Sequence, residues 1–138
     1  NGLMPIHMAC KLRTEELMLT ELIKLGADVN APSNDEYNRP PIYFAIENPN
    51  PSKTIETLVN AGANLRVAIG KGLTPLQYAV CMRNMDAVRT LLNIDETLLF
   101  YDWIWPLKTL IMENDLDMIK VFIGSFRSRF FLHILKIR

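Results

Sequence analysis

Apolar residues recur along the chain in groups that share one spacing. Each group occupies positions i, i+1, i+4 and i+5, which lie on one face of an α-helix. The groups are Met18, Leu19, Leu22 and Ile23; Thr54, Ile55, Leu58 and Val59; Ala87, Val88, Leu91 and Leu92; and Met118, Ile119, Phe122 and Ile123. The pattern therefore predicts four amphipathic helices, spaced along most of the chain.

A short proline-led motif precedes each of these groups. The four segments read GLMPIHMAC, NRPPIYFAI, GLTPLQYAV and WIWPLKTLI, and their prolines, Pro5, Pro41, Pro75 and Pro106, are 36, 34 and 31 residues apart. Proline suits the first turn of a helix, because its φ is already helical and the N–H that it lacks has no partner there. Each unit therefore predicts a proline-opened helix, a break and a second, amphipathic helix.

Other residues of the units support these helix boundaries. Thr74 directly precedes Pro75, where a hydroxyl can cap the helix N-terminus. Gly26 and Gly62 stand where the second helices should end, and glycine can take the left-handed conformation that closes a helix. Small residues after the prolines would let neighbouring helices lie close together, and these residues are Ala9, Ala45 and Ala79.

On these motifs the chain resembles the ankyrin-repeat family, whose signature is Gly-x-Thr-Pro-Leu-His-x-Ala-Ala, a second helix and then Gly-Ala-Asp-Val-Asn, in units of about 33 residues. The resemblance covers roughly residues 1–125. It implies an all-α fold, an ankyrin-repeat solenoid of stacked helix-turn-helix units with short β-hairpin-like loops. The repeats would span approximately 1–34, 35–68, 69–101 and 102–125. Residues 126–138 are expected to form a C-terminal capping helix or the start of a further repeat.

The chain also departs from the family signature. Met4 and Pro40 replace the signature threonine, and His7 alone keeps the signature histidine, which is replaced by Tyr43, Gln77 and Lys108 in the other units. The fourth unit has Trp103 and Trp105 in place of Gly and Thr. Tetratricopeptide repeats have a similar period, but they lack the Thr-Pro opening and the Gly-Ala-Asp turn.

Composition fits one folded domain and gives no global charge signal. Of the 138 residues 22% are charged, with 15 Lys plus Arg against 15 Asp plus Glu, so no overall field attracts nucleic acid or membrane. The chain has no long apolar run typical of a membrane span and no export signal. We therefore expect an intracellular protein, cytoplasmic or nuclear. The abrupt start at NGLMPIH suggests a piece of something longer.

Catalytic and metal-binding patterns are not evident. The segment GKGLT lacks the spacing of a phosphate-binding loop, and His7 and His133 are isolated. Cys10 fits a small buried position, and Cys81 falls on an exposed side without a basic neighbour in sequence. We expect no enzymatic activity, no cofactor and no metal.

Two apolar features have alternative interpretations. Met82, Met85 and Met112 are interpreted as core filler rather than as an adaptable contact surface. The segment GSFRSRFFLHILKIR carries four basic and no acidic residues among many apolar ones. One alternative is a membrane-surface helix, and another is an arm that binds acidic lipid or nucleic acid. Four charges are few for binding DNA, so no nucleic acid is expected. A segment that caps the stack is the favoured interpretation.

The resemblance implies protein recognition by the hairpin tips and the first helices. Matching positions carry over as partner-binding candidates, with Tyr37, Arg39 and Tyr101 as the favoured anchors because aromatic and arginine side chains dominate interfaces. The candidates are Lys11, Leu12, Glu36, Tyr37, Arg39, Glu47, Asn48, Lys71, Leu73, Cys81, Met82, Tyr101, Asp102, Ile104, Met112 and Glu113.

The main functional hypothesis is thus a non-catalytic scaffold that binds a protein partner on a concave face. The alternative is a regulatory or assembly segment of a larger protein, such as a channel, ubiquitin ligase or kinase, that packs on its own neighbouring domains. The abrupt start and the apolar C-terminal segment favour this alternative.

Overall fold

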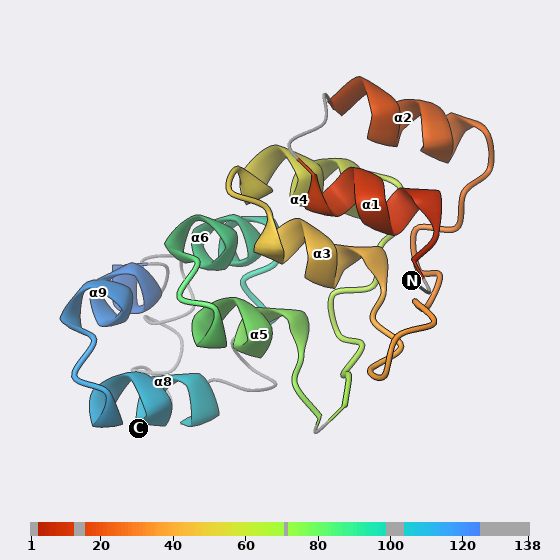
Figure 1. Cartoon of the computed structure of the whole chain (residues 1–138). Helices are drawn as coiled ribbons and strands as arrows, with labels where there is room; N and C mark the ends of the chain where they lie inside the picture. Colours follow the sequence, from red (N-terminus) through yellow and green to blue (C-terminus); the bar gives the residue numbers. More distant parts are fainter. Residues whose placement is uncertain (1–2, 13–15, 71, 99–103, 125–138) are drawn as a thin grey trace.

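The computed structural model describes residues 3–12, 16–70, 72–98 and 104–124. These residues form eight α-helices and no β-strand. The helices, shown in Figure 1, are α1 (Pro5–Lys11), α2 (Glu16–Lys24), α3 (Pro41–Glu47), α4 (Pro51–Asn60), α5 (Pro75–Cys81), α6 (Met85–Ile94), α8 (Ile104–Met112) and α9 (Leu116–Gly124).

The helices are arranged as four stacked pairs. Helix α1 contacts α2, α3 contacts α4, α5 contacts α6 and α8 contacts α9. The first helices form one row in the order α1, α3, α5, α8, and the second helices form a parallel row in the order α2, α4, α6, α9 (Figure 1). The predicted all-α stack of paired helices is therefore confirmed.

The prolines open the first helices, as predicted, with one exception. Pro5, Pro41 and Pro75 are the first residues of α1, α3 and α5. Helix α8 begins earlier, at Ile104, so Pro106 is its third residue. Proline is still tolerated there, because the first four N–H groups of a helix have no intrahelical acceptor. The start predicted for this helix was therefore two residues too late.

The N-termini of α1 and α5 are capped in two different ways. In α5 the Thr74 hydroxyl accepts from the Gln77 backbone N–H at 3.3 Å, and the Gln77 side chain accepts from the Thr74 N–H at 2.9 Å. In α1 the threonine is absent, and the Met4 backbone N–H donates to Nδ1 of His7 at 3.0 Å. His7 is fully buried and its Nε2 lies 2.8 Å from the Ala31 carbonyl oxygen. His7 therefore has a structural role.

The second helices and the tips that follow them also agree with the sequence. Gly26 and Gly62 have φ of 90° and 97°, the left-handed conformation that closes α2 and α4. After α4 the chain makes a tight antiparallel turn, in which the Ile69 N–H donates to the Leu73 carbonyl at 3.0 Å. The tip before α3 is joined by a bond from the Ser33 N–H to the Arg39 carbonyl, also 3.0 Å. These are the predicted hairpin-like loops.

Burial of the predicted helix faces is complete only in the middle of the stack. All four apolar residues of α6, Ala87, Val88, Leu91 and Leu92, are buried. In contrast, Met18 on α2 and Ile123 on α9 are each 53% exposed, although the pattern predicted both for a buried face. The physical reason is that the first and last described pairs have a neighbouring pair on one side only.

Three methionines interpreted as core filler are instead exposed. Met82, Met85 and Met112 expose 48%, 43% and 76% of their surface. Helix α5 ends at Cys81, so Met82 and Met85 flank the break before α6 and do not continue a buried helix face. The core-filler interpretation was therefore wrong for all three.

Asparagine side chains join consecutive pairs at the breaks between helices. Nδ2 of Asn48 donates to the Cys10 and Leu12 carbonyls at 2.9 and 3.2 Å. Nδ2 of Asn84 makes the same kind of bond to the Ile46 carbonyl at 2.8 Å. Each amide thus satisfies a carbonyl at the end of the first helix in the preceding pair, where no further helical turn can do so.

Replacing Asn48 with alanine should destabilise the fold, because it leaves buried carbonyl groups of the first pair without a donor. A penalty of about 1 to 3 kcal/mol is expected for an unsatisfied buried group. Urea unfolding followed by circular dichroism measures the change. Asn93→Ala is the matched control, since Asn93 is exposed on α6. Equal unfolding midpoints for the two variants would rule out the bridging role of Asn48.

Candidate functional site

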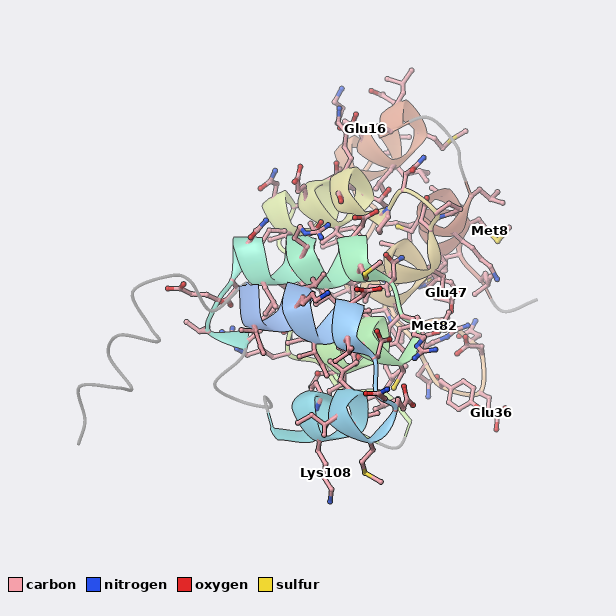
Figure 2. The ribbon with its side chains drawn as sticks, turned by 90° about the vertical axis from the view of Figure 1, so that its left-hand side faces the viewer. Met8, Glu16, Glu36, Glu47, Met82 and Lys108 are labelled. Carbon is pink, nitrogen blue, oxygen red and sulfur yellow. The ribbon has the colours of Figure 1, made fainter. Side chains whose placement is uncertain are left out.

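The first helices and the hairpin tips share one surface, which we call the inner-helix face. It includes exposed side chains from several pairs. Figure 2 labels Met8, Glu47 and Met82, from α1, α3 and the end of α5, along one edge of the molecule. The exposed apolar members include Met8 at 39%, Leu12 at 46%, Met82 at 48% and Met112 at 76%.

Arg39, on the tip before α3, is held by contacts with its own chain. Its Nε donates to the Asp35 carboxylate at 2.9 Å, and Nη1 donates to the Glu47 carboxylate at 2.6 Å. The guanidinium also stacks over the Phe44 ring, 4.4 Å from the ring centroid. With these contacts only 18% of the side chain is exposed. Arg39 was predicted as a free anchor for a partner, but it is primarily an intramolecular tie.

Glu47 extends the same cluster over three helix pairs. Besides Arg39, its carboxylate accepts from the Tyr78 hydroxyl on α5, and Lys11 Nζ on α1 lies 3.8 Å away. Only 16% of the Glu47 side chain is exposed. Because an ion pair with little exposure is screened less by water than a surface pair, the Arg39–Glu47 pair with Tyr78 can hold the orientation of α3 and α5. We call Lys11, Asp35, Arg39, Glu47 and Tyr78 the charged cluster.

The cluster changes the acidity of two members. Burial by itself would raise the pKa of Asp35, but hydrogen bonds from Ser33, Arg39 and the Tyr37 backbone, with the charge of Arg39, lower that pKa to about 2. Burial and then the bond to Glu47 raise the pKa of Tyr78 to about 12. At neutral pH Asp35 is therefore an anion, and Tyr78 keeps the proton that it donates.

The other candidates on the second and third tips differ in exposure. Glu36 and Tyr37 are exposed, Tyr37 at 50%, and the Tyr37 ring covers Gly70, where an added Cβ would lie 3.1 Å from Cδ1. Leu73 is half-buried beside the turn. Asn48 is 4% exposed and its amide is committed to stacking, so it was wrongly placed on a contact surface.

The remaining candidates lie toward the fourth pair. Met112 and Glu113 are exposed at the end of α8, and Glu113 lies 3.7 Å from Arg83. Cys81 is exposed, as predicted. Lys71, Tyr101 and Asp102 lie outside the described residues, and so does the side chain of Ile104.

Sequence reasoning missed two residues of the inner-helix face, Met8 and Tyr78. Both stand three positions after the opening proline, like Phe44 in the second unit. Phe44 at this position is fully buried, so the spacing from proline alone does not identify exposed residues.

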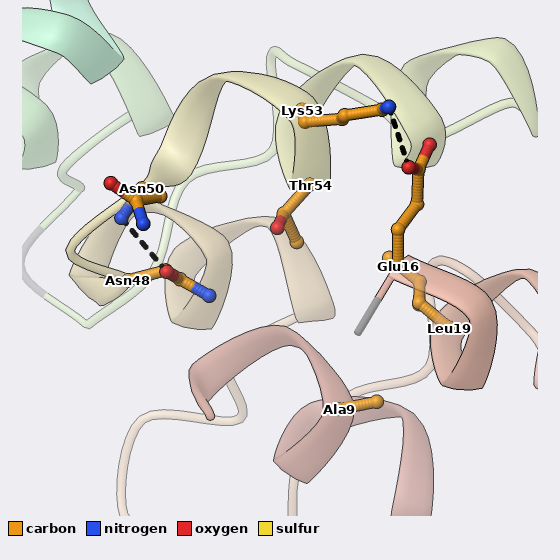
Figure 3. Close-up of a pocket in the computed structure, with 7 residues that line it drawn as sticks. All are labelled: Ala9, Glu16, Leu19, Asn48, Asn50, Lys53 and Thr54. Carbon is orange, nitrogen blue, oxygen red and sulfur yellow. Dashed lines mark hydrogen bonds and ion pairs between the residues drawn. The ribbon is translucent and has the colours of Figure 1, made fainter. Parts of the chain in front are cut away.

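Two open pockets lie between elements outside this face. One of about 480 Å³ is lined by residues of α1, α2, α4 and the break before α4, and Figure 3 shows Glu16 paired with Lys53 across it at 2.7 Å. In this pocket the side-chain oxygen Oδ1 of Asn48 accepts a hydrogen bond from the backbone N–H of Asn50. The second, of about 560 Å³, lies between α4 and α6, where the Thr90 hydroxyl donates to that of Ser52. Their polar groups are mostly engaged with one another.

The described side chains offer contact surface rather than an activated nucleophile. Burial raises the pKa of the Cys10 thiol to about 12, and burial followed by the Glu113 charge raises that of Cys81. Neither thiol is thus favoured as a thiolate. Within the four described ranges, no group of three or more His, Cys, Asp or Glu side chains could hold a metal ion.

Lowering the pH should weaken the contribution of Asp35 to stability. Its folded pKa of about 2 is below the ordinary value of 3.8, so its contribution is complete above about pH 4 and declines as the pH falls toward 2. Asp35→Asn should therefore be less stable than wild type at pH 6, with a gap that narrows between pH 4 and 2 in urea unfolding. Glu36→Gln, one residue away and exposed, is the control. A gap that does not change with pH would contradict this role.

Comparison with known proteins agrees with the geometry. The family model for the ankyrin repeat matches residues 71–97, which include α5 and α6. A protein of fowlpox virus (strain NVSL) that is named as an ankyrin repeat protein is 34% identical over 84 residues. The match covers 60% of this chain but 12% of the viral protein, so the chain spans a small part of that relative.

Among the described helices none is long and apolar enough to cross a bilayer. The repeated motifs, the stacked helix pairs and both comparisons support an ankyrin-repeat protein.

Proposed function

We propose that the chain is a non-catalytic scaffold that binds a protein partner on its inner-helix face. Ankyrin repeats are generally protein-interaction modules, and the family is typically non-catalytic. The observation that carries the proposal is the set of exposed apolar side chains that stacking leaves free on this face. These side chains are Met8, Leu12, Met82 and Met112.

The chemistry of these residues suits protein recognition. Methionine is unbranched and polarizable, so its side chain can adapt to apolar groups of different shape. The charged cluster lies between the methionines of α1 and those near α5, with Glu47 between Met8 and Met82 in Figure 2. A partner would thus meet adaptable apolar contacts on a base fixed by ion pairs, and little of that base would need to be ordered on binding.

A second use of the same face is docking within one polypeptide. The matched segment is only 12% of the fowlpox relative, so that protein has much more chain beside its counterpart of this region. If this chain is likewise part of a larger protein, the inner-helix face would hold a neighbouring domain, as a regulatory or assembly segment does. Both uses need the same exposed apolar contacts.

Charge placed on the inner-helix face should abolish partner capture without unfolding the chain. In the double variant Leu12→Glu with Met82→Glu, two carboxylates would be forced against the partner. We expect at least about a tenfold loss of captured partner in quantitative mass spectrometry of cell extract, since losing one or two interface contacts costs more than about 1.4 kcal/mol. Arg39 is not a suitable probe, because its replacement would also break the charged cluster.

Leu17→Glu is the matched control for capture, because Leu17 is 62% exposed on α2, in the row of second helices. Thermal unfolding of all three proteins should be nearly the same. Loss of capture by the control, or full capture by the double variant, would contradict binding on the inner-helix face.

A further inference from the structure

The breaks between the two helices of the third and fourth pairs have the same backbone conformation. Arg83 and Asn114 both lie in the left-handed region, with φ of 54° and 55°. The residues that follow them, Asn84 and Asp115, cap α6 and α9 with side-chain oxygens, by bonds of 3.1 Å in both cases. Asp115 therefore occupies the place in the fourth pair that Asn84 occupies in the third.

These two capping residues differ in what they can donate. Besides capping α6, Asn84 uses Nδ2 to bond the Ile46 carbonyl of the preceding pair at 2.8 Å. An ionised carboxylate is an acceptor only, so Asp115 cannot make the equivalent bond to the third pair. The fourth pair thus needs another way to fix its break against the break of the third pair.

Arg83 of the third pair makes this connection from the opposite side. Its Nη2 lies 3.0 Å from Oδ2 of Asp115 and 3.7 Å from Oε2 of Glu113. The Asp115 side chain is 17% exposed, whereas that of Arg83 is 58% exposed. The donor here belongs to the preceding pair, and the connection is an ion pair rather than a neutral amide bond.

The backbone of Arg83 indicates that arginine stands here for its side chain. The left-handed conformation is unfavourable for residues with a Cβ, and asparagine adopts it more readily than arginine. The other non-glycine residues with positive φ in the described ranges are Asn38 and Asn114. Arginine at position 83 therefore gives up backbone stability that asparagine would keep, and the contact with Asp115 offsets that loss.

We propose that the Arg83 ion pair makes the docking of the fourth helix pair sensitive to ionic strength. Dissolved salt screens charges that are in contact with water, but it has little effect on a neutral amide bond such as that of Asn84. At low ionic strength the ion pair holds the break between α8 and α9 against the break between α5 and α6. At high ionic strength this hold weakens, and α8 and α9 separate from the stack more often.

The inner-helix face would respond to this change. Met82 directly precedes Arg83, and Met112 directly precedes Glu113, so the ion pair fixes the spacing of two exposed methionines. A partner that spans both would bind more weakly at high salt, although its contacts with them are apolar. This consequence rests on the proposed function, whereas the docking of the fourth pair does not.

Hydrogen–deuterium exchange of the whole chain at about 0.05 M and about 1 M NaCl tests the proposal. For an ion pair of this exposure, exchange in α8 and α9 should rise about two- to fivefold at the higher concentration. Arg83→Asn should show this rise already at low salt, even though asparagine suits the left-handed backbone. Arg83→Lys keeps the charge and should recover part of the protection. Exchange in α3 and α4 is the reference for general effects of salt.

Asp115→Asn keeps an oxygen to cap α9 and restores the amide that Asn84 has, so its exchange should respond little to salt. Arg89→Gln is the matched control, since Arg89 is similarly exposed but pairs with Asp86 inside α6, and it should behave like the wild type.

Three results would each overturn the proposal. They are equal exchange of wild-type α8 and α9 at both salt concentrations, full protection in Arg83→Asn, and an undiminished salt response in Asp115→Asn. No partner takes part in the experiment, so its outcome does not depend on whether the inner-helix face binds one.

Discussion

Each helix pair in this chain depends on its neighbours to remove its apolar faces from water. A unit of about 33 residues has an apolar surface on both sides and cannot cover either one alone. The gradient of burial along the stack shows this constraint directly. Leu58 of the second pair is fully buried, while Leu22 at the equivalent position of the first pair is only partly buried. Coverage from both sides, rather than helix propensity, therefore decides which apolar residues belong to the core.

Stacking also buries polar backbone groups, and these groups must find partners. The position two residues after the opening proline meets this need with a different side chain in each of the first three units. His7 joins the Met4 N–H and the Ala31 carbonyl, the Tyr43 hydroxyl donates to the Val67 and Leu73 carbonyls, and Gln77 completes the cap of α5 with Thr74. The family histidine can thus be replaced when another side chain reaches the same kind of backbone group.

The period of the sequence was sufficient to predict the helix pairs, their closing glycines and their order. It was not sufficient for the candidate site, because several contacts there join residues of different units. Arg39 is close to Tyr78, and Asn48 to Cys10, only after neighbouring pairs have stacked. Inspection of one unit at a time leaves the Asn48 amide without its Cys10 partner, so Asn48 was predicted to contact a protein partner. The exposure of Met82 depends on where α5 ends, which the period does not specify to a single residue.

The inner-helix face consequently combines two kinds of side chain with different physical roles. Glu47 and Arg39 contribute little exposed surface, and their contacts with each other and with Tyr78 join α3 to α5. Met8 and Met82 are exposed on either side of them and have no such constraint. A change in the methionines would alter the fit to a partner at small cost to the fold, while a change in the paired charges would alter the spacing of the helices themselves. Recognition and stacking can therefore vary separately, even though their residues share a single surface.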